Sequence, residues 1–268
     1  MKQTFCSLKP PLLVGSIRQR TAEAAIEDIR NGELEGADAF ILHIQLMNGQ
    51  DQHFDAFREI AASTDRPMMA LYYKTEDGAG DEQRLSIMKE AVKAGFGSVD
   101  IPMYMYDDDA PGSLESCGMP FAAANPGEVS MRPEVIRKQK ELIQEFHDRG
   151  AEVLMSAHVG VELSVEQAAA LALEIESRNA DMVKIITDCQ SAEQQIEILR
   201  TNLALKKLLK VPFICTCSGK YSRFIRLNAP LFGSMLVFGH HEYGELANRD
   251  KPLLKDVREL HRIMKKHP

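Results

Sequence analysis

A lysine in an apolar segment and a histidine in the preceding strand-like segment are the residues of this chain best suited to chemistry. Lys184 lies in Ala-Asp-Met-Val-Lys-Ile-Ile-Thr (180–187), which has the pattern of a buried parallel strand. Desolvation lowers the pKa of a buried ammonium group, and the resulting neutral amine is a nucleophile toward carbonyls. His158 ends the segment Glu-Val-Leu-Met-Ser-Ala-His (152–158). The pair predicts an imine-forming lysine with a proton-transfer partner.

The elements that must position these two side chains follow a regular alternation. Eight short apolar segments predict strands, at 12–17, 39–46, 68–74, 98–103, 152–158, 182–187, 212–218 and 234–239. Amphipathic segments predict helices, at 21–35, 51–62, 82–94, 132–148, 164–177, 191–209 and 253–266. The chain has 268 residues and contains no glycine-rich dinucleotide or phosphate-loop motif. We therefore expect an α/β fold, a single (β/α)8 TIM barrel domain over residues 1–268.

Strand parity predicts which side chains face the barrel interior. In the segment 39–46, every second residue from Phe40 to Leu46 is apolar, and this face suits packing against helices. His43 and Gln45 lie on the other face and should line the interior. The same rule places Ser156 on the face of His158. Polar side chains of several strands are thus expected to converge.

Composition excludes several classes of partner. The formal net charge is −7 and no dense Lys/Arg cluster is present, so nucleic acid and anionic membranes are not expected partners. No segment has the length of a signal peptide core or a bilayer span, which predicts a cytoplasmic protein. The five cysteines have neither a disulfide nor a zinc-finger spacing, and Cys215 and Cys217 are expected to pack in the core.

A long segment at about 104–131 interrupts the alternation between the fourth strand and its helix. Loops that follow barrel strands lie on the catalytic face, and loops of this length are often functional. We expect it to act as a lid or as an interface element of a homodimer, or to be an ordered surface excursion.

Three segments carry a resemblance to a known family. Met-Ser-Ala-His (155–158) and Ala-Asp-Met-Val-Lys-Ile (180–185) contain the histidine and lysine, and a third segment extends from Gly219-Lys220 through Arg226-Leu227 to Leu231-Phe232-Gly233-Ser234. In order and spacing, the chain resembles type I 3-dehydroquinate dehydratase, the Schiff-base lyase of the shikimate pathway, over nearly its whole length. The resemblance implies no cofactor and a small keto acid as the binding partner.

The resemblance also implies roles for individual residues. Lys184 would form an imine with a ketone, which acidifies the adjacent C–H, and His158 would act as general base and then as general acid. Arg226, rather than Arg223, would hold the substrate carboxylate. The substrate-binding residues implied or predicted in this way are Arg226, His43, Gln45, Tyr73, Ser156 and Asp100.

Several positions depart from the family pattern. His43-Ile44-Gln45 stands where the family has Glu-x-Arg, and Tyr73 stands in place of the third-strand arginine. Asp77-Gly78-Ala79 replaces Glu-Gly-Gly, and Pro102 replaces the second carboxylate of the fourth strand, whereas Asp100 is kept. A bidentate arginine replaced by glutamine or tyrosine loses its planar donors.

Further departures lie in later strands. Thr216 and Ser218 stand where the family has interior methionines, and the late Pro-Gly-Gln lid is not recognisable in 245–252.

Two alternatives to plain dehydratase activity, and one alternative role for three of the polar side chains, stay open at this point. The chain could eliminate water from, or cleave, a different hydroxylated keto acid through the same imine. It could be a binding protein on the same scaffold, given the lost glutamate and arginine positions. A divalent metal held by His43, Asp100 and His158 is a third arrangement that imidazole and carboxylate ligands allow.

Overall fold

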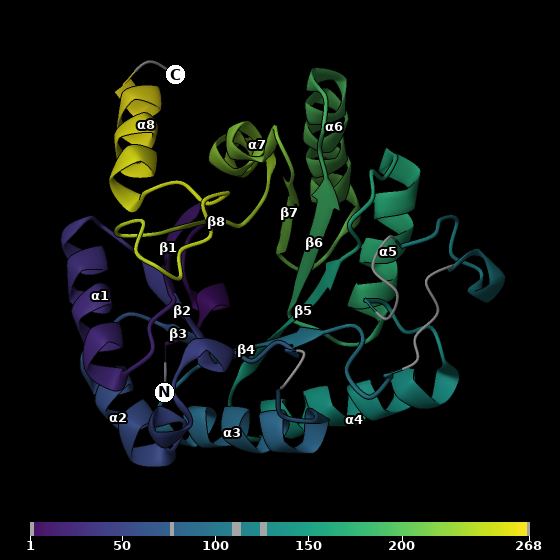
Figure 1. Ribbon diagram of the computed structural model, residues 1–268. Coiled ribbons are helices and arrows are strands. Elements are labelled where there is room, and N and C mark those ends of the chain that lie inside the picture. Colours follow the sequence, from purple (N-terminus) through teal and green to yellow (C-terminus); the bar gives the residue numbers. More distant parts are fainter. Residues whose placement is uncertain (1–2, 76–77, 109–113, 124–127, 267–268) are drawn as a thin grey trace. The chain divides into compact units, whose positions relative to one another are not determined.

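The computed structural model describes residues 3–75, 78–108, 114–123 and 128–266, and it contains eight parallel strands that alternate with helices along the chain (Figure 1). Neighbouring strands follow the order β7-β6-β5-β4-β3-β2-β1-β8. The strands are β1 (Leu12–Ile17), β2 (Ala39–His43), β3 (Met68–Leu71), β4 (Ser98–Pro102), β5 (Glu152–His158), β6 (Met182–Asp188), β7 (Phe213–Ser218) and β8 (Leu236–Gly239). This order and alternation are those of a (β/α)8 TIM barrel, so the predicted fold class is confirmed.

The helices agree with the amphipathic segments to within a few residues, with one addition. They are α1 (Ala22–Leu34), α2 (Phe54–Ala62), α3 (Asp81–Ala94), α4 (Pro133–Asp148), α5 (Val165–Ser177), α6 (Ala192–Leu208), α7 (Ser222–Asn228) and α8 (Leu254–Lys266). The short helix α7 was not predicted. Its seven residues are too few to show a helical hydrophobic period.

The second strand is shorter than predicted. It ends at His43, and Ile44–Leu46 forms one turn of 3₁₀ helix. His43 leaves the extended region, with φ −85° and ψ 83°, so the chain turns there and the strand parity that was applied to Gln45 does not hold. The prediction of strand through 46 was therefore wrong, although Gln45 still lies beside His43.

The chain groups into two compact units. The first contains residues 1–99, 149–151 and 236–268, and the second contains residues 100–148 and 152–235. The prediction of one undivided domain with a lid or interface segment at 104–131 stays a prediction. No helix in the described residues is long and apolar enough to cross a membrane.

In the first unit, an aromatic side chain sets the face of β2 that meets the helices. The ring of Phe40 lies so close over Gly15 of β1 and Gly32 of α1 that a Cβ atom at either glycine would collide with it. Phe40 is therefore buried between strand and helix, as its parity predicted. The opposite face of β2 carries His43, whose imidazole contacts Ser16 of β1.

In the second unit, the helices α5 and α6 lie alongside β5, β6 and β7 (Figure 1). Both helices begin with a capping box, formed by Ser164 with Gln167 and by Ser191 with Gln194. These caps satisfy backbone groups at the start of the helices that follow β5 and β6.

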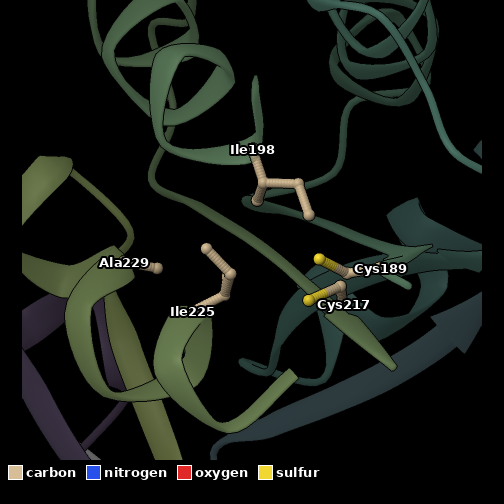
Figure 2. Packing of buried hydrophobic residues seen from close by; sticks show 5 residues of the cluster. All are labelled: Cys189, Ile198, Cys217, Ile225 and Ala229. Atoms are coloured by element: carbon tan, nitrogen blue, oxygen red, sulfur yellow. The ribbon is translucent and has the colours of Figure 1, made fainter. Parts of the chain in front are cut away.

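A small apolar cluster in the second unit lies between β7 and the helices α6 and α7. It consists of Cys189, Ile198, Cys217, Ile225 and Ala229. Figure 2 shows the two sulfur atoms side by side, both directed toward the isoleucines, which come from α6 and α7. Both thiols are buried, and burial raises the pKa of each. The predicted packing role of Cys217 is confirmed, and Cys215 is likewise buried, with a pKa raised to about 12.

The two ends of the 104–131 segment are fastened within the second unit. Gln139 of α4 donates from Nε2 to the carbonyls of Met103 and Met105, at 2.8 Å each. Ser130 donates to the carboxylate of Asp107 at 2.5 Å, and Arg178 donates to the Ser130 carbonyl at 2.7 Å. Ser130, two residues after Glu128, is thus fixed by Asp107 and by Arg178, the residue that follows α5.

Candidate active site

The lysine singled out in the sequence is the third residue of β6 and is 5% exposed. Its Nζ atom lies 2.9 Å from Oδ2 of Asp100, which is fully buried in β4. The other oxygen of this carboxylate accepts a hydrogen bond of 2.6 Å from Oγ of Ser156. Ser156 is paired with Lys184 in the β5–β6 register. A buried amine and a buried carboxylate therefore face each other across three strands.

The histidine at the end of β5 has a carboxylate partner that was not predicted. Oε1 of Glu128 lies 3.1 Å from Nδ1 of His158 and accepts a 2.6 Å hydrogen bond from the His158 backbone N–H. Because a carboxylate can only accept, Nδ1 carries the proton in the neutral ring. Nε2 is then the unprotonated nitrogen, which is the atom a general base needs.

The environment keeps this imidazole neutral. Burial lowers the pKa of His158, and the positive charge of Lys184 lowers it further, while Glu128 and Asp100 act in the opposite direction. The first two effects prevail, so the ring is a base rather than an acid at neutral pH.

Arg226 is the cation that the resemblance assigns to a substrate carboxylate. It lies in α7 and is 8% exposed, whereas Arg223 in the same helix is exposed. Arg226 also acts on the thiol of Cys217 in β7. Burial raises the pKa of this thiol, and the positive charge of Arg226 opposes that increase. Of the two arginines, Arg226 is the one turned inward. Its role as a carboxylate ligand stays a prediction.

The remaining predicted residues lie in the first unit. His43 is buried, with Nε2 3.1 Å from Oγ of Ser16 and Nδ1 3.2 Å from a guanidinium nitrogen of Arg18. Gln45 lies with its Nε2 3.4 Å from the same Nδ1. Tyr73 is half-buried just after β3. The substrate contacts predicted for these three residues stay predictions, and Asp77 lies outside the described residues.

The side chains considered for a metal have other contacts. His43 contacts Ser16 and Arg18, Asp100 contacts Lys184 and Ser156, and His158 contacts Glu128. In the described part of the chain, no three His, Cys, Asp or Glu side chains gather as a set that could hold a metal ion.

The structure therefore brings together four of the predicted site residues, Lys184, Asp100, Ser156 and His158, within the second unit. Glu128 is the residue that sequence reasoning missed. Glu128 lies in an irregular segment, where no hydrophobic period gives the direction of a side chain. The one signal in the sequence was that Pro102 stands where the family has a second carboxylate, so that a carboxylate from elsewhere was needed. An amine held by a carboxylate, beside a neutral imidazole held by a second carboxylate, can form an imine and move a proton at a neighbouring carbon.

Comparison with known proteins assigns this chain to a family. The model of the family described as type I 3-dehydroquinase matches residues 14–268. A 3-dehydroquinate dehydratase of Methanosarcina acetivorans is 22% identical over 253 residues, which cover 91% of this chain and 92% of the relative. A second one, of Syntrophotalea carbinolica, is 29% identical over 138 residues, which cover 49% of this chain and 53% of the relative.

Solved structures agree at the level of the fold. The 3-dehydroquinate dehydratase of Geobacillus kaustophilus superposes with a TM-score of 0.76 at 13% identity, covering 97% of this chain and 93% of the other. The type I enzyme of Clostridium difficile, solved with covalently modified comenic acid, superposes with a TM-score of 0.75 at 16% identity, covering 97% and 95%.

Proposed function

Because the chain belongs to the type I 3-dehydroquinase family, we propose that it is a lyase that removes water from 3-dehydroquinate through an imine on Lys184. One observation carries the proposal: the buried Lys184 ammonium lies 2.9 Å from Asp100, on the strand next to the neutral base His158. If the Lys184–Asp100 ion pair were only structural, it would need neither a neighbouring imidazole with a lowered pKa nor a carboxylate that binds Nδ1 of that imidazole.

Imine formation uses Lys184 and Asp100. Oδ2 of Asp100 accepts a proton from the ammonium, which frees the nitrogen lone pair to attack the ketone carbon and form a carbinolamine. The protonated Asp100 then returns this proton to the carbinolamine hydroxyl, which leaves as water. The product is a cationic iminium that faces the Asp100 carboxylate, so the buried positive charge is balanced before and after the step.

Elimination uses His158. Nε2 removes a proton from the carbon next to the iminium, and the C–H electron pair forms a neutral enamine. The enamine then re-forms the iminium by expelling the hydroxyl group of the next carbon, and the imidazolium donates the proton with which that group leaves as water. Glu128 acts as a positioning residue here, because its bond to Nδ1 directs Nε2 at the substrate and stabilises the imidazolium.

Product release and substrate orientation complete the cycle. A water molecule adds to the iminium carbon, and the carbon–nitrogen bond breaks to give the enone and the ammonium form of Lys184. We assign to Arg226 the binding of the substrate carboxylate, since its guanidinium is inward and cationic. Holding the carboxylate fixes which carbon presents its proton to the base.

Steady-state assay with 3-dehydroquinate tests the proposal. The conjugated enone product absorbs in the ultraviolet, so its appearance reports dehydration directly. We expect turnover by the unmodified protein and none after reduction with borohydride in the presence of substrate. Full activity after that treatment would contradict an imine mechanism.

A second candidate function is favoured by His43, Gln45 and Tyr73, which stand where the family has a carboxylate and two guanidinium groups. Such a change weakens hydrogen bonds to ring hydroxyls and favours a different hydroxylated keto acid, processed by the same imine chemistry. Substrate comparison separates the two candidates. Weak turnover of 3-dehydroquinate together with efficient trapping of another hydroxylated ketone favours the second.

A further inference from the structure

Arg178 is a fully buried cation of the second unit that does not touch the proposed reacting groups. It follows α5 directly and is 0% exposed. Its charge is balanced by Glu174, which accepts from Nε at 3.0 Å and lies 2.9 Å from one terminal nitrogen. A buried ion pair adds little stability over well-packed apolar side chains. The stability of the fold alone therefore does not explain a guanidinium at this position.

The other bonds of this guanidinium connect two parts of the chain. One terminal nitrogen donates to Oε1 of Gln139 in α4 at 2.6 Å, and the other donates to the carbonyl of Ser130 at 2.7 Å. Gln139 in turn donates to the carbonyls of Met103 and Met105, just after β4. Both Gln139 and Ser130 are fully buried. The planar fork of Arg178 thus fixes Ser130 relative to the end of β4.

Ser130 is held at all three of its polar groups. Besides its carbonyl, its backbone N–H donates to the carbonyl of Met103 at 3.2 Å, and its hydroxyl donates to Asp107 at 2.5 Å. Asp107 is also paired with Arg132 at 3.1 Å. Glu128 is two residues from Ser130, which is about 7 Å of extended chain at most. Fixing Ser130 therefore restricts where Glu128 can lie.

These bonds form a closed ring that includes the proposed base. The backbone N–H of Met103 donates at 2.9 Å to the carbonyl of Ser156, two residues before His158 in β5. The ring closes where Glu128 accepts from the His158 backbone N–H at 2.6 Å. The carboxylate therefore approaches Nδ1 of the imidazole, at 3.1 Å, from a direction that the ring sets.

We propose that Arg178 is a positioning residue of the imine chemistry and acts through Glu128. By fixing Ser130, it holds the Glu128 carboxylate against His158. The proposal rests on the proposed function, in which Glu128 directs Nε2 of His158 at the substrate. An apolar side chain could fill the space of Arg178, but it could not bind Gln139 and the Ser130 carbonyl at once. Catalysis depends steeply on such placement, since a displacement of about 1 Å can cost about 100-fold in rate.

NMR titration of the His158 imidazole tests the proposal in the free protein, without substrate. Burial and the charge of Lys184 lower the pKa of His158, whereas Glu128 and Asp100 raise it. Arg178→Lys should move this pKa downward, because the Glu128 carboxylate no longer stays at Nδ1. Lysine keeps the positive charge, but its single nitrogen cannot bind both acceptors.

Two further variants calibrate the titration. Glu128→Gln gives the shift that follows loss of the carboxylate, and Arg178→Lys should move the pKa in the same direction and no further. Arg84→Lys is the matched control, because Arg84 is also 0% exposed and donates to a backbone carbonyl, that of Tyr72, at 2.8 Å. It should leave the His158 titration unchanged. An unchanged titration in Arg178→Lys, or an equal shift in Arg84→Lys, would overturn the proposal.

A smaller change carries the test if Arg178→Lys does not fold. Ser130→Ala removes only the hydroxyl bond to Asp107, and it should move the pKa of His158 in the same direction by a smaller amount. Its control is Ser234→Ala, since Ser234 is 1% exposed and its hydroxyl oxygen accepts a backbone hydrogen bond elsewhere in the second unit. An unchanged titration in Ser130→Ala would then overturn the proposal.

Kinetics connect the placement to catalysis. With 3-dehydroquinate, Arg178→Lys should lose no more kcat than the roughly 10- to 100-fold expected for Glu128→Gln, with little change in KM. The double variant should be no slower than Glu128→Gln alone. Losses that multiply in the double variant would mean that Arg178 acts by another route and would overturn the proposal. The expected titration shift without turnover in any variant or in the unmodified protein would contradict the proposed function, while supporting the placement of Glu128 by Arg178.

Discussion

Each of the two units contains a histidine that ends a strand and a buried lysine, but their partners differ. In the second unit, Lys184 contacts Asp100 and His158 contacts Glu128. In the first unit, Lys251 contacts the hydroxyl of Ser16, and His43 contacts that hydroxyl and the guanidinium of Arg18. The same residue types are thus matched with carboxylates in one unit and with further donors in the other.

The difference teaches what each cluster can do. A carboxylate beside an amine or imidazole accepts its proton or balances its charge, so groups paired in this way can pass through cationic intermediates. Neither a serine hydroxyl nor a guanidinium is a base of this kind. We therefore place the proposed proton transfer in the second unit.

Replacing the amine should have the largest effect. Lys184→Met should abolish measurable turnover, and it should also destabilise the fold by about 3–5 kcal/mol, because the fully buried Asp100 carboxylate loses its cation. The double variant Lys184→Met/Asp100→Asn should regain much of the stability but none of the activity. Urea unfolding and enone assays measure the two effects. An active Lys184→Met protein would contradict the covalent role.

Removing the base should slow elimination while leaving the imine able to form. His158→Ala should lose roughly 10²–10⁴ in kcat. The covalent intermediate should accumulate, so mass spectrometry after mixing with substrate should show more adduct than in the unmodified protein. Near-normal turnover in this variant would remove His158 from the mechanism.

The positioning carboxylate should matter less than the base that it orients. Glu128→Gln should lower kcat roughly 10- to 100-fold, since one hydrogen bond to a charged group is lost as the imidazolium forms. Because Glu128 raises the pKa of His158, its loss should also move the acid limb of the pH profile further down. Glu134→Gln, an exposed glutamate at the start of α4, is the control and should match the unmodified protein. A slower Glu128→Gln enzyme with an unmoved profile would indicate a merely structural role.

The smallest expected effect is on the pH dependence of the unmodified enzyme. Catalysis needs neutral His158, so activity falls as pH drops through its pKa. Burial, followed by the charge of Lys184, lowers this pKa, and the acid limb of kcat/KM should therefore lie below the ordinary histidine value of about 6.5. A midpoint above that value in the pH–rate profile would contradict the neutral-base assignment.

The fold was predictable because its signals are local and repeated. Apolar strands and amphipathic helices alternate along the chain, and β1 and β5 were located to the residue. The second strand was predicted too long because Ile44 and Leu46 continue the apolar alternation after the backbone has turned at His43. Hydrophobic pattern reports burial, and it cannot report where an extended chain ends.

The candidate site was predictable only where it lies on strands. Lys184, Ser156 and His158 were proposed from parity and resemblance, whereas Glu128 lies in an irregular segment whose path depends on long-range bonds such as that from Arg178 to Ser130.

Mapping of a borohydride-reduced adduct tests the central claim most directly. The protein is incubated with 3-dehydroquinate, reduced, digested and analysed by mass spectrometry, with Lys184→Met treated in parallel. We predict one modified lysine, Lys184, and no adduct in the variant, because this is the amine that lies beside Asp100 and in the field of His158. An adduct on Lys74 or Lys220, or an equal adduct in Lys184→Met, would contradict the account.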